Sequence, residues 1–116
     1  MPLITVDLPR ALYDEKHEEI SAGIHQAQID ALKIPADDKF QIFTPYDSEH
    51  APTRFGTDRP GQIIVGVTMV HHHTIEEKQE LYTQVMVQLG RLGIDPGDVH
   101  IPLAENNYHD WYAGSL

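Results

Sequence analysis

Cysteine is absent from this chain of 116 residues. Its absence excludes disulfides, thiolate catalysis and cysteine-ligated zinc. Basic residues are scarce as well: 8 Lys and Arg stand against 18 Asp and Glu, a formal charge of −10. Such a surface repels phosphate groups, so we expect neither nucleic acid nor an anionic membrane as a partner. An anionic substrate would need a local cationic pocket.

Long apolar runs are also missing, since none approaches the roughly 20 residues of a membrane span. The first ten residues lack the apolar stretch of a secretory signal. We therefore expect a cytoplasmic protein. Apolar residues make up 41% of the chain, which is ordinary for a globular protein. The length fits one domain over residues 1–116.

The order of predicted strands and helices contains the same unit twice. Alternation of apolar and polar residues predicts strands, and apolar residues at helical spacing predict helices. In chain order, these patterns predict a strand at 3–8, a helix at about 14–32, a strand at 39–44, a long loop at 45–61, a strand at 62–70, a helix at about 74–92 and a strand at 98–104.

The two halves also share local detail. Asp14-Glu15-Lys16 corresponds to Glu76-Glu77-Lys78, and Ile34…Asp38 corresponds to Ile94…Asp98, a period close to 60 residues. We assign half-repeats at about 2–45 and 62–105 and a C-terminal tail at 106–116. The predicted fold class is α+β (α/β): a tandem β-α-β repeat with a four-stranded mixed sheet and two helices on one face. The other face needs a cover, which we expect to be another subunit.

Each predicted helix has one apolar stripe. In the first helix the stripe consists of Ile20, Ile24, Ala27 and Ala31. In the second it consists of Ile75, Lys78, Tyr82, Val85, Leu89 and Leu92. Thr74 is the expected N-cap of the second helix, in a capping box with Glu77.

The sharpest chemical feature is Met1-Pro2. Initiator methionine is normally removed when the next residue is small, which would leave Pro2 as a free secondary amine. Pro2 shares side-chain parity with Ile4, Val6 and Leu8, so this amine would begin an apolar row. Desolvation disfavours the charged amine and suits it to act as a general base. Proline is also tolerated as a first strand residue without any catalytic role.

Several motifs resemble the tautomerase superfamily. Met1-Pro2-Leu3-Ile4-Thr5-Val6 is similar to the start of 4-oxalocrotonate tautomerase relatives. Other stretches resemble malonate semialdehyde decarboxylase, a fused-repeat member: Ile34 to Gln41, Glu77-Lys78, Gly93 to Val99, and Glu105-Asn106 through Asp110-Trp111. The resemblance implies an enzyme without a cofactor, a homotrimer, and sites near each N-terminal proline. Its substrate would be a small oxo or enol carboxylic acid.

The resemblance also implies site residues. Pro2 matches the catalytic proline, Asp38 matches an acidic residue that positions or activates water, and Trp111 matches an aromatic residue of the pocket wall. His71 and His73 stand where the decarboxylase pattern has two arginines that hold the substrate carboxylate. Histidine lacks the bidentate fork of arginine. Other candidate cations are Arg10, Arg54 and Arg59.

The sequence is compatible with two reactions, which differ in the protonation state of Pro2. A neutral Pro2 would move a proton between carbon and oxygen in keto-enol tautomerisation. A protonated Pro2 would polarise a carbonyl while Asp38 handles water, giving decarboxylation or hydration. Two alternatives are a non-catalytic binding protein on the same fold and a metal-dependent enzyme using His71 and His73, with a third ligand such as His50, His100 or Glu105. Our prediction includes no metal.

Overall fold

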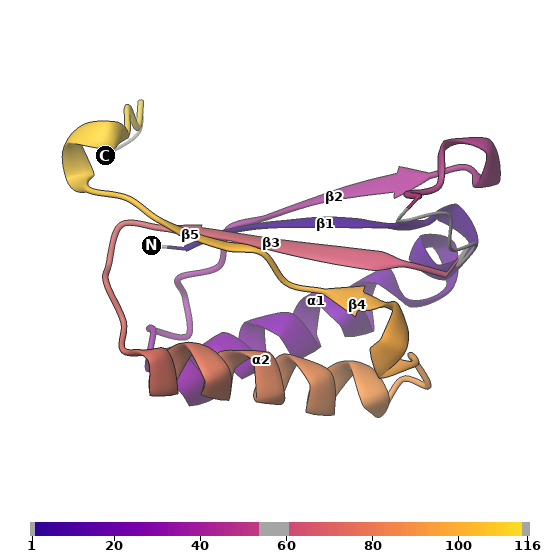
Figure 1. Ribbon diagram of the computed structural model, residues 1–116, viewed down its shortest axis with the longest axis horizontal. Helices are drawn as coiled ribbons and strands as arrows, with labels where there is room; N and C mark the ends of the chain where they lie inside the picture. Colours follow the sequence, from indigo (N-terminus) through magenta and orange to yellow (C-terminus); the bar gives the residue numbers. More distant parts are fainter. Residues whose placement is uncertain (1, 54–60, 115–116) are drawn as a thin grey trace.

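The computed structural model describes residues 2–53 and 61–114 of the chain. Its elements are, in order, β1 (Leu3–Pro9), α1 (Arg10–Leu32), β2 (Gln41–Tyr46), η1 (Ser48–His50), β3 (Ile63–Met69), α2 (Ile75–Gly90), η2 (Pro96–Asp98), β4 (Val99–His100), β5 (Leu103–Glu105) and η3 (Tyr108–Asp110). Both helices cover one face of a mixed sheet (Figure 1). The predicted fold class is confirmed.

The sheet has the order β2-β1-β3-β4, and β5 also pairs with β3. β1 runs parallel to β2, and β3 runs parallel to β4 and β5. The two central strands, β1 and β3, are antiparallel. Each half of the sequence is thus a parallel β-α-β unit, and the two units meet along β1 and β3, as the repeat predicts.

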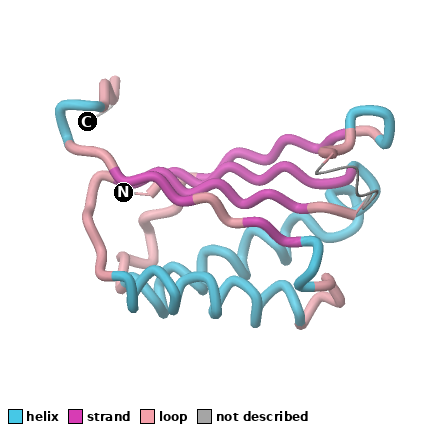
Figure 2. The backbone as a smooth tube through the Cα atoms, in the orientation of Figure 1, coloured by secondary structure: helices cyan, strands magenta, loops and turns pink. Residues whose placement is uncertain are grey.

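The sheet has five strands, whereas the sequence predicts four. The predicted strand at 98–104 is interrupted between β4 and β5, although its register against β3 is the same on both sides: Ile63 pairs with Val99, and Val67 with Leu103. Pro102 lies in the interruption. It has no N–H to donate, but its carbonyl accepts a hydrogen bond from the Val67 N–H at 2.9 Å. One stretch of chain therefore forms both strands (Figure 2).

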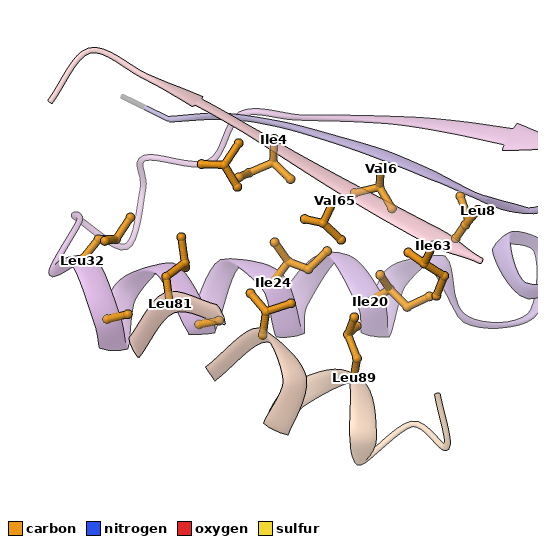
Figure 3. Packing of buried hydrophobic residues seen from close by; sticks show 14 of the residues in the cluster. Ile4, Val6, Leu8, Ile20, Ile24, Leu32, Ile63, Val65, Leu81 and Leu89 are labelled. Atoms are coloured by element: carbon orange, nitrogen blue, oxygen red, sulfur yellow. The ribbon is translucent and has the colours of Figure 1, made fainter. Parts of the chain in front are cut away.

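The core lies between the sheet and the helices (Figure 3). It contains alternate residues of β1 and β3 together with one side of each helix. All four residues of the predicted α1 stripe are buried. In α2 the buried residues are Leu81, Val85 and Leu89, but Ile75 is 68% exposed, so its place in the predicted stripe was wrong. Ile75 is the first residue of α2, and the buried residues of this helix begin only at Leu81, so the stripe does not extend to the start of the helix.

α1 starts at Arg10, earlier than the predicted Asp14. Lys16 has non-helical angles (φ −135°, ψ 15°), so a short first segment is joined to the main helix across a kink. The helix ends at Lys33, which has left-handed angles (φ 58°, ψ 35°). Over residues 2–53 and 61–114, neither helix has the length and apolar character needed to cross a membrane.

Candidate active site

Four predicted site residues, Pro2, Asp38, His71 and His73, lie at one end of the sheet. Pro2 is buried immediately before β1. The pairing of Leu3 with Thr68, and the 3.0 Å hydrogen bond from the Ile4 N–H to the Phe40 carbonyl, hold this end of β1 between its neighbours. Because pairing continues residue by residue, Pro2 comes next to the segments that contain Asp38 and His71.

A hollow of about 400 Å³ opens at this end of the sheet. It is lined by the end of α1, the turn that follows it and the segment after β3: Leu32, Lys33, Ile34, Pro35, Asp38, His71, His72 and His73. Its volume is in the range of small-molecule sites. The Asp38 N–H donates to the Pro35 carbonyl at 3.0 Å, which closes the turn that brings Asp38 to the hollow. Pro2 is not among the lining residues, but it shares the buried, helix-facing parity of Ile4.

The three histidines follow β3 rather than continuing it. Strand alternation predicts that His71 and His73 point one way and His72 the other. However, β3 ends at Met69, so this rule does not extend to the histidines, and all three line the hollow. His71 and His72 are exposed, whereas the side chain of His73 is only 16% exposed.

Glu105, at the end of β5, holds the histidine segment in place. Its carboxylate accepts hydrogen bonds from the His73 backbone N–H at 2.9 Å and from Lys78 Nζ at 2.5 Å. His72 Nδ1 lies 3.8 Å from Glu105 Oε2. The hydrogen bond from Lys78, followed by that from His73, lowers the pKa of Glu105. Because the glutamate side chain is only 17% exposed, these contacts are partly shielded from water.

The start of α2 is fixed to the same segment by the predicted capping box, which is confirmed. Thr74 Oγ1 accepts from the Glu77 N–H at 3.1 Å, and Glu77 Oε1 accepts from the Thr74 N–H at 3.0 Å. Glu77 Oε2 also lies 3.4 Å from His73 Nδ1. The hydrogen bonds from Thr74, and then that from His73, lower the pKa of Glu77.

The C-terminal segment contacts the histidines from the helix-free side of the sheet (Figure 1). The rings of Tyr108 and His71 meet edge to face, with centroids 5.9 Å apart and planes at 85°. His72 Nε2 lies 3.4 Å from Asn107 Oδ1. Trp111 is half-buried, and its Nε1 donates to Asn106 Oδ1 at 2.9 Å. Trp111 thus lies on the segment that contacts the histidines, but it is not among the residues that line the hollow.

Arg10 lies at the opposite end of the sheet. It follows β1, whose seven residues span about 23 Å at about 3.3 Å per residue. Its Nε donates to Asp47 Oδ1 at 2.8 Å; this contact raises the pKa of Arg10 and lowers that of Asp47. Arg10 is thus not brought to Pro2 within one chain. The other candidate cations, Arg54 and Arg59, lie outside the described residues.

Within residues 2–53 and 61–114, no third ligand lies close enough to support the hypothesis of a metal at His71 and His73. In the parts of the chain that the structure describes, the group of three side chains close enough to share an ion consists of Asp47, Glu49 and His50. All three are exposed, and they lie at the end of the sheet where Arg10 pairs with Asp47. His71 and His73 belong to no such group within these residues.

Sequence reasoning missed two residues of this region. Strand alternation separated His72 from His71 and His73, but His72 lines the hollow with them, because β3 ends before the three histidines. Lys33 was not considered at all, although it lines the hollow. A signal for it was present, because the correspondence of Ile34 with Ile94 aligns Lys33 with Gly93. A lysine in place of a glycine at the end of a helix is unusual.

Comparisons with known proteins identify the family to which the chain belongs. A family model described as "Tautomerase enzyme" matches residues 38–114. The chain is 28% identical to "Probable tautomerase YusQ" of Bacillus subtilis, over 99% of this chain and 94% of that protein. It is 34% identical to FG41 malonate semialdehyde decarboxylase inhibited by 3-bromopropiolate, with a TM-score of 0.83 over 97% of this chain and 88% of the other. A fused 4-OT asymmetric trimer has the same fold, at 18% identity and a TM-score of 0.84 over 98% of this chain and 94% of that one. The chain belongs to the tautomerase superfamily, whose members are enzymes.

Proposed function

We propose that this protein acts on small oxo or enol carboxylic acids through the amine of Pro2, and that its principal reaction is keto-enol tautomerisation. The observation that carries the proposal is the burial of Pro2 at the end of the sheet where Asp38 and three histidines line a hollow. Removal of Met1 would free the Pro2 nitrogen. Burial disfavours the charged form of an amine, so the free nitrogen would be able to accept a proton.

The proposed reaction moves one proton. The neutral Pro2 nitrogen accepts the proton of an enol hydroxyl group, the C=O bond forms as the C=C bond breaks, and the protonated nitrogen returns the same proton to the substrate carbon. No cofactor is needed, because acid-base chemistry at one amine suffices. His71 and His73 orient the substrate carboxylate, and Trp111 closes the wall of the pocket.

Decarboxylation is the second candidate reaction. Two observations favour it: Asp38 lines the hollow, and the protein at 34% identity is a malonate semialdehyde decarboxylase. In that branch Pro2 is protonated and polarises the substrate carbonyl, while Asp38 positions water.

A homotrimer forms part of the proposal. The helix-free face of the sheet exposes Phe40 and Ile42, with relative exposures of 41% and 48%. Burying such a face against other copies would be favourable. In this assembly, an Arg10 at the far end of one subunit's sheet could serve the hollow of another subunit. Equilibrium sedimentation tests the assembly: a trimer is expected for the wild type and dissociation for Ile42→Lys, whereas a monomeric wild type would refute it.

The activity test uses phenylenolpyruvate, whose ketonisation is followed by ultraviolet absorbance. We expect turnover by the wild type and a loss of at least about 100-fold in kcat/KM for Pro2→Ala, since a positioned acid-base group contributes that much. Pro96→Ala is the matched control, because Pro96 is exposed in η2. Intact mass of the unfused protein reports on Met1. Retention of Met1, or equal rates for Pro2→Ala and the wild type, would refute the proposal.

The second assay separates the two reactions. Release of carbon dioxide from malonate semialdehyde is measured for the wild type and for Asp38→Asn. If tautomerisation is the principal reaction, the wild type should turn over phenylenolpyruvate faster than malonate semialdehyde. Asp38→Asn should then have little effect on the turnover of phenylenolpyruvate. Rapid decarboxylation that is lost in Asp38→Asn would instead assign the decarboxylase reaction.

A further inference from the structure

Lys33 has an unusual backbone conformation. Among the described residues it is the one non-glycine residue with positive φ, at 58°. Left-handed angles bring a side chain's Cβ close to the backbone, so glycine or asparagine usually occupies this position after a helix. A lysine here is unfavourable for the fold, and such positions cluster at functional sites.

The repeat provides an internal comparison. The correspondence of Ile34 with Ile94 aligns Lys33 with Gly93, which also has a positive φ, of 81°. The second half thus uses glycine at the equivalent turn, as the backbone prefers. That turn follows α2, whose C-terminal end lies at the other end of the molecule from the hollow (Figure 1). The lysine occurs in the half whose turn lines the hollow.

Lys33 also supplies a charge that the hollow otherwise lacks. Among the described residues that line the hollow, it is the one lysine or arginine. The chain carries a formal charge of −10, so an anionic substrate is repelled unless a cation lies close to its binding site. The Lys33 ammonium donates to the Asp30 carbonyl at 2.6 Å on an exposed surface. That contact stabilises the helix end, but it does not require left-handed angles at Lys33, because a lysine within the last helical turn would make it equally well.

We propose that Lys33 binds the carboxylate of the substrate, beside His71 and His73 in the same hollow. This assignment rests on the proposed function, since it concerns the same hollow. With this assignment, the ligand has its carboxylate near the end of α1 and its reacting carbon towards Pro2. A lysine binds a carboxylate as a point charge on a flexible stem, so it tolerates acids of different shapes.

The test measures binding rather than turnover, so that it does not depend on the proposed reaction. The dissociation constant of phenylpyruvate is measured by titration calorimetry for the wild type, Lys33→Gly, Lys33→Arg and Arg91→Gln. Arg91 is the matched control, because it is an exposed cation at the C-cap of α2 and does not line the hollow. Lys33→Gly suits the backbone, so weaker binding cannot be ascribed to misfolding, and circular dichroism checks this.

We expect Lys33→Gly to weaken binding about tenfold, as the loss of one charge-assisted contact does. Lys33→Arg and Arg91→Gln should bind as the wild type does, and added salt should weaken wild-type binding more than that of Lys33→Gly. Equal affinities of the wild type and Lys33→Gly, or no measurable binding of phenylpyruvate, would overturn the assignment. Failure of the proposed function would be seen separately, as phenylenolpyruvate turnover that does not depend on Pro2.

Discussion

Replacing Thr74 by alanine removes half of the capping box that begins α2. The Glu77 N–H loses its acceptor, Thr74 Oγ1, at 3.1 Å, while the bond from the Thr74 N–H to Glu77 remains. N-cap substitutions of this kind cost about 1 kcal/mol. With an unfolding entropy of about 2.1 cal/mol/K per residue, a chain of 116 residues should melt about 4 °C lower.

The matched control is Thr83→Ala. Thr83 is exposed in the interior of α2, where alanine has the higher helix propensity by roughly 0.5 kcal/mol. The same chemical change should therefore raise stability at position 83 and lower it at position 74. Urea unfolding followed by circular dichroism measures both, at one protein concentration because assembly shifts the apparent stability.

The effect should depend on pH with a defined sign. Hydrogen bonds from Thr74 lower the folded-state pKa of Glu77. A lowered pKa means that the carboxylate stabilises the fold above its ordinary pKa, and that this contribution is lost as the pH falls through the folded-state value. Thr74→Ala removes part of the lowering, so its difference from the wild type should shrink in acid. An equal cost at pH 7 and pH 3, or none at pH 7, would refute the reasoning.

Three further predictions test other parts of the structure. Leu81→Ala opens a cavity in the core, where Leu81 is 1% exposed, and should destabilise the fold by about 2–5 kcal/mol in urea unfolding; a smaller value would mean that the helices repack. Gly93→Ala places a side chain at φ 81° and should lower stability by about 1 kcal/mol by the same measurement, whereas an unchanged midpoint would contradict the left-handed turn. Glu105→Gln removes the ion pair with Lys78. Because the folded-state pKa of Glu105 is lowered, its contribution is present above its ordinary pKa, so the variant should lose stability at pH 7 and approach the wild type in acid; parallel pH profiles from thermal melts would contradict this.

Much of the fold followed from local pattern. The alternation of Ile4, Val6 and Leu8 indicated which face of β1 is buried, and the helical spacing of Ile20 and Ile24 indicated the buried side of α1. Both patterns are set by the pitch of one element, which neighbouring elements do not change. The repeat then gave the order of the elements, since two similar β-α-β units in one chain can share one sheet.

The predictions from sequence were wrong where a local pattern ends, because contacts with other elements determine where a strand or a buried helix face ends. β3 ends at Met69, so the alternation assumed for the histidines does not apply. Ile75 begins α2 and is exposed there, because the core does not extend to the start of this helix. The fourth strand is interrupted at Pro102, and β4 and β5 keep one register because both pair with β3.

For the site, the amino-acid sequence indicates which residue types are present: a proline at position 2, an acidic residue after a predicted turn, a run of histidines and few cations. Which of these residues share a hollow depends on the three-dimensional fold. It brought Asp38, Lys33 and the histidines together and separated Arg10 from them by the length of β1. This follows because parallel β-α-β units carry the chain from one end of the sheet to the other and back. Residues distant in sequence therefore lie close together at one end of the sheet. Which residues do so depends on strand register and helix length rather than on any local pattern.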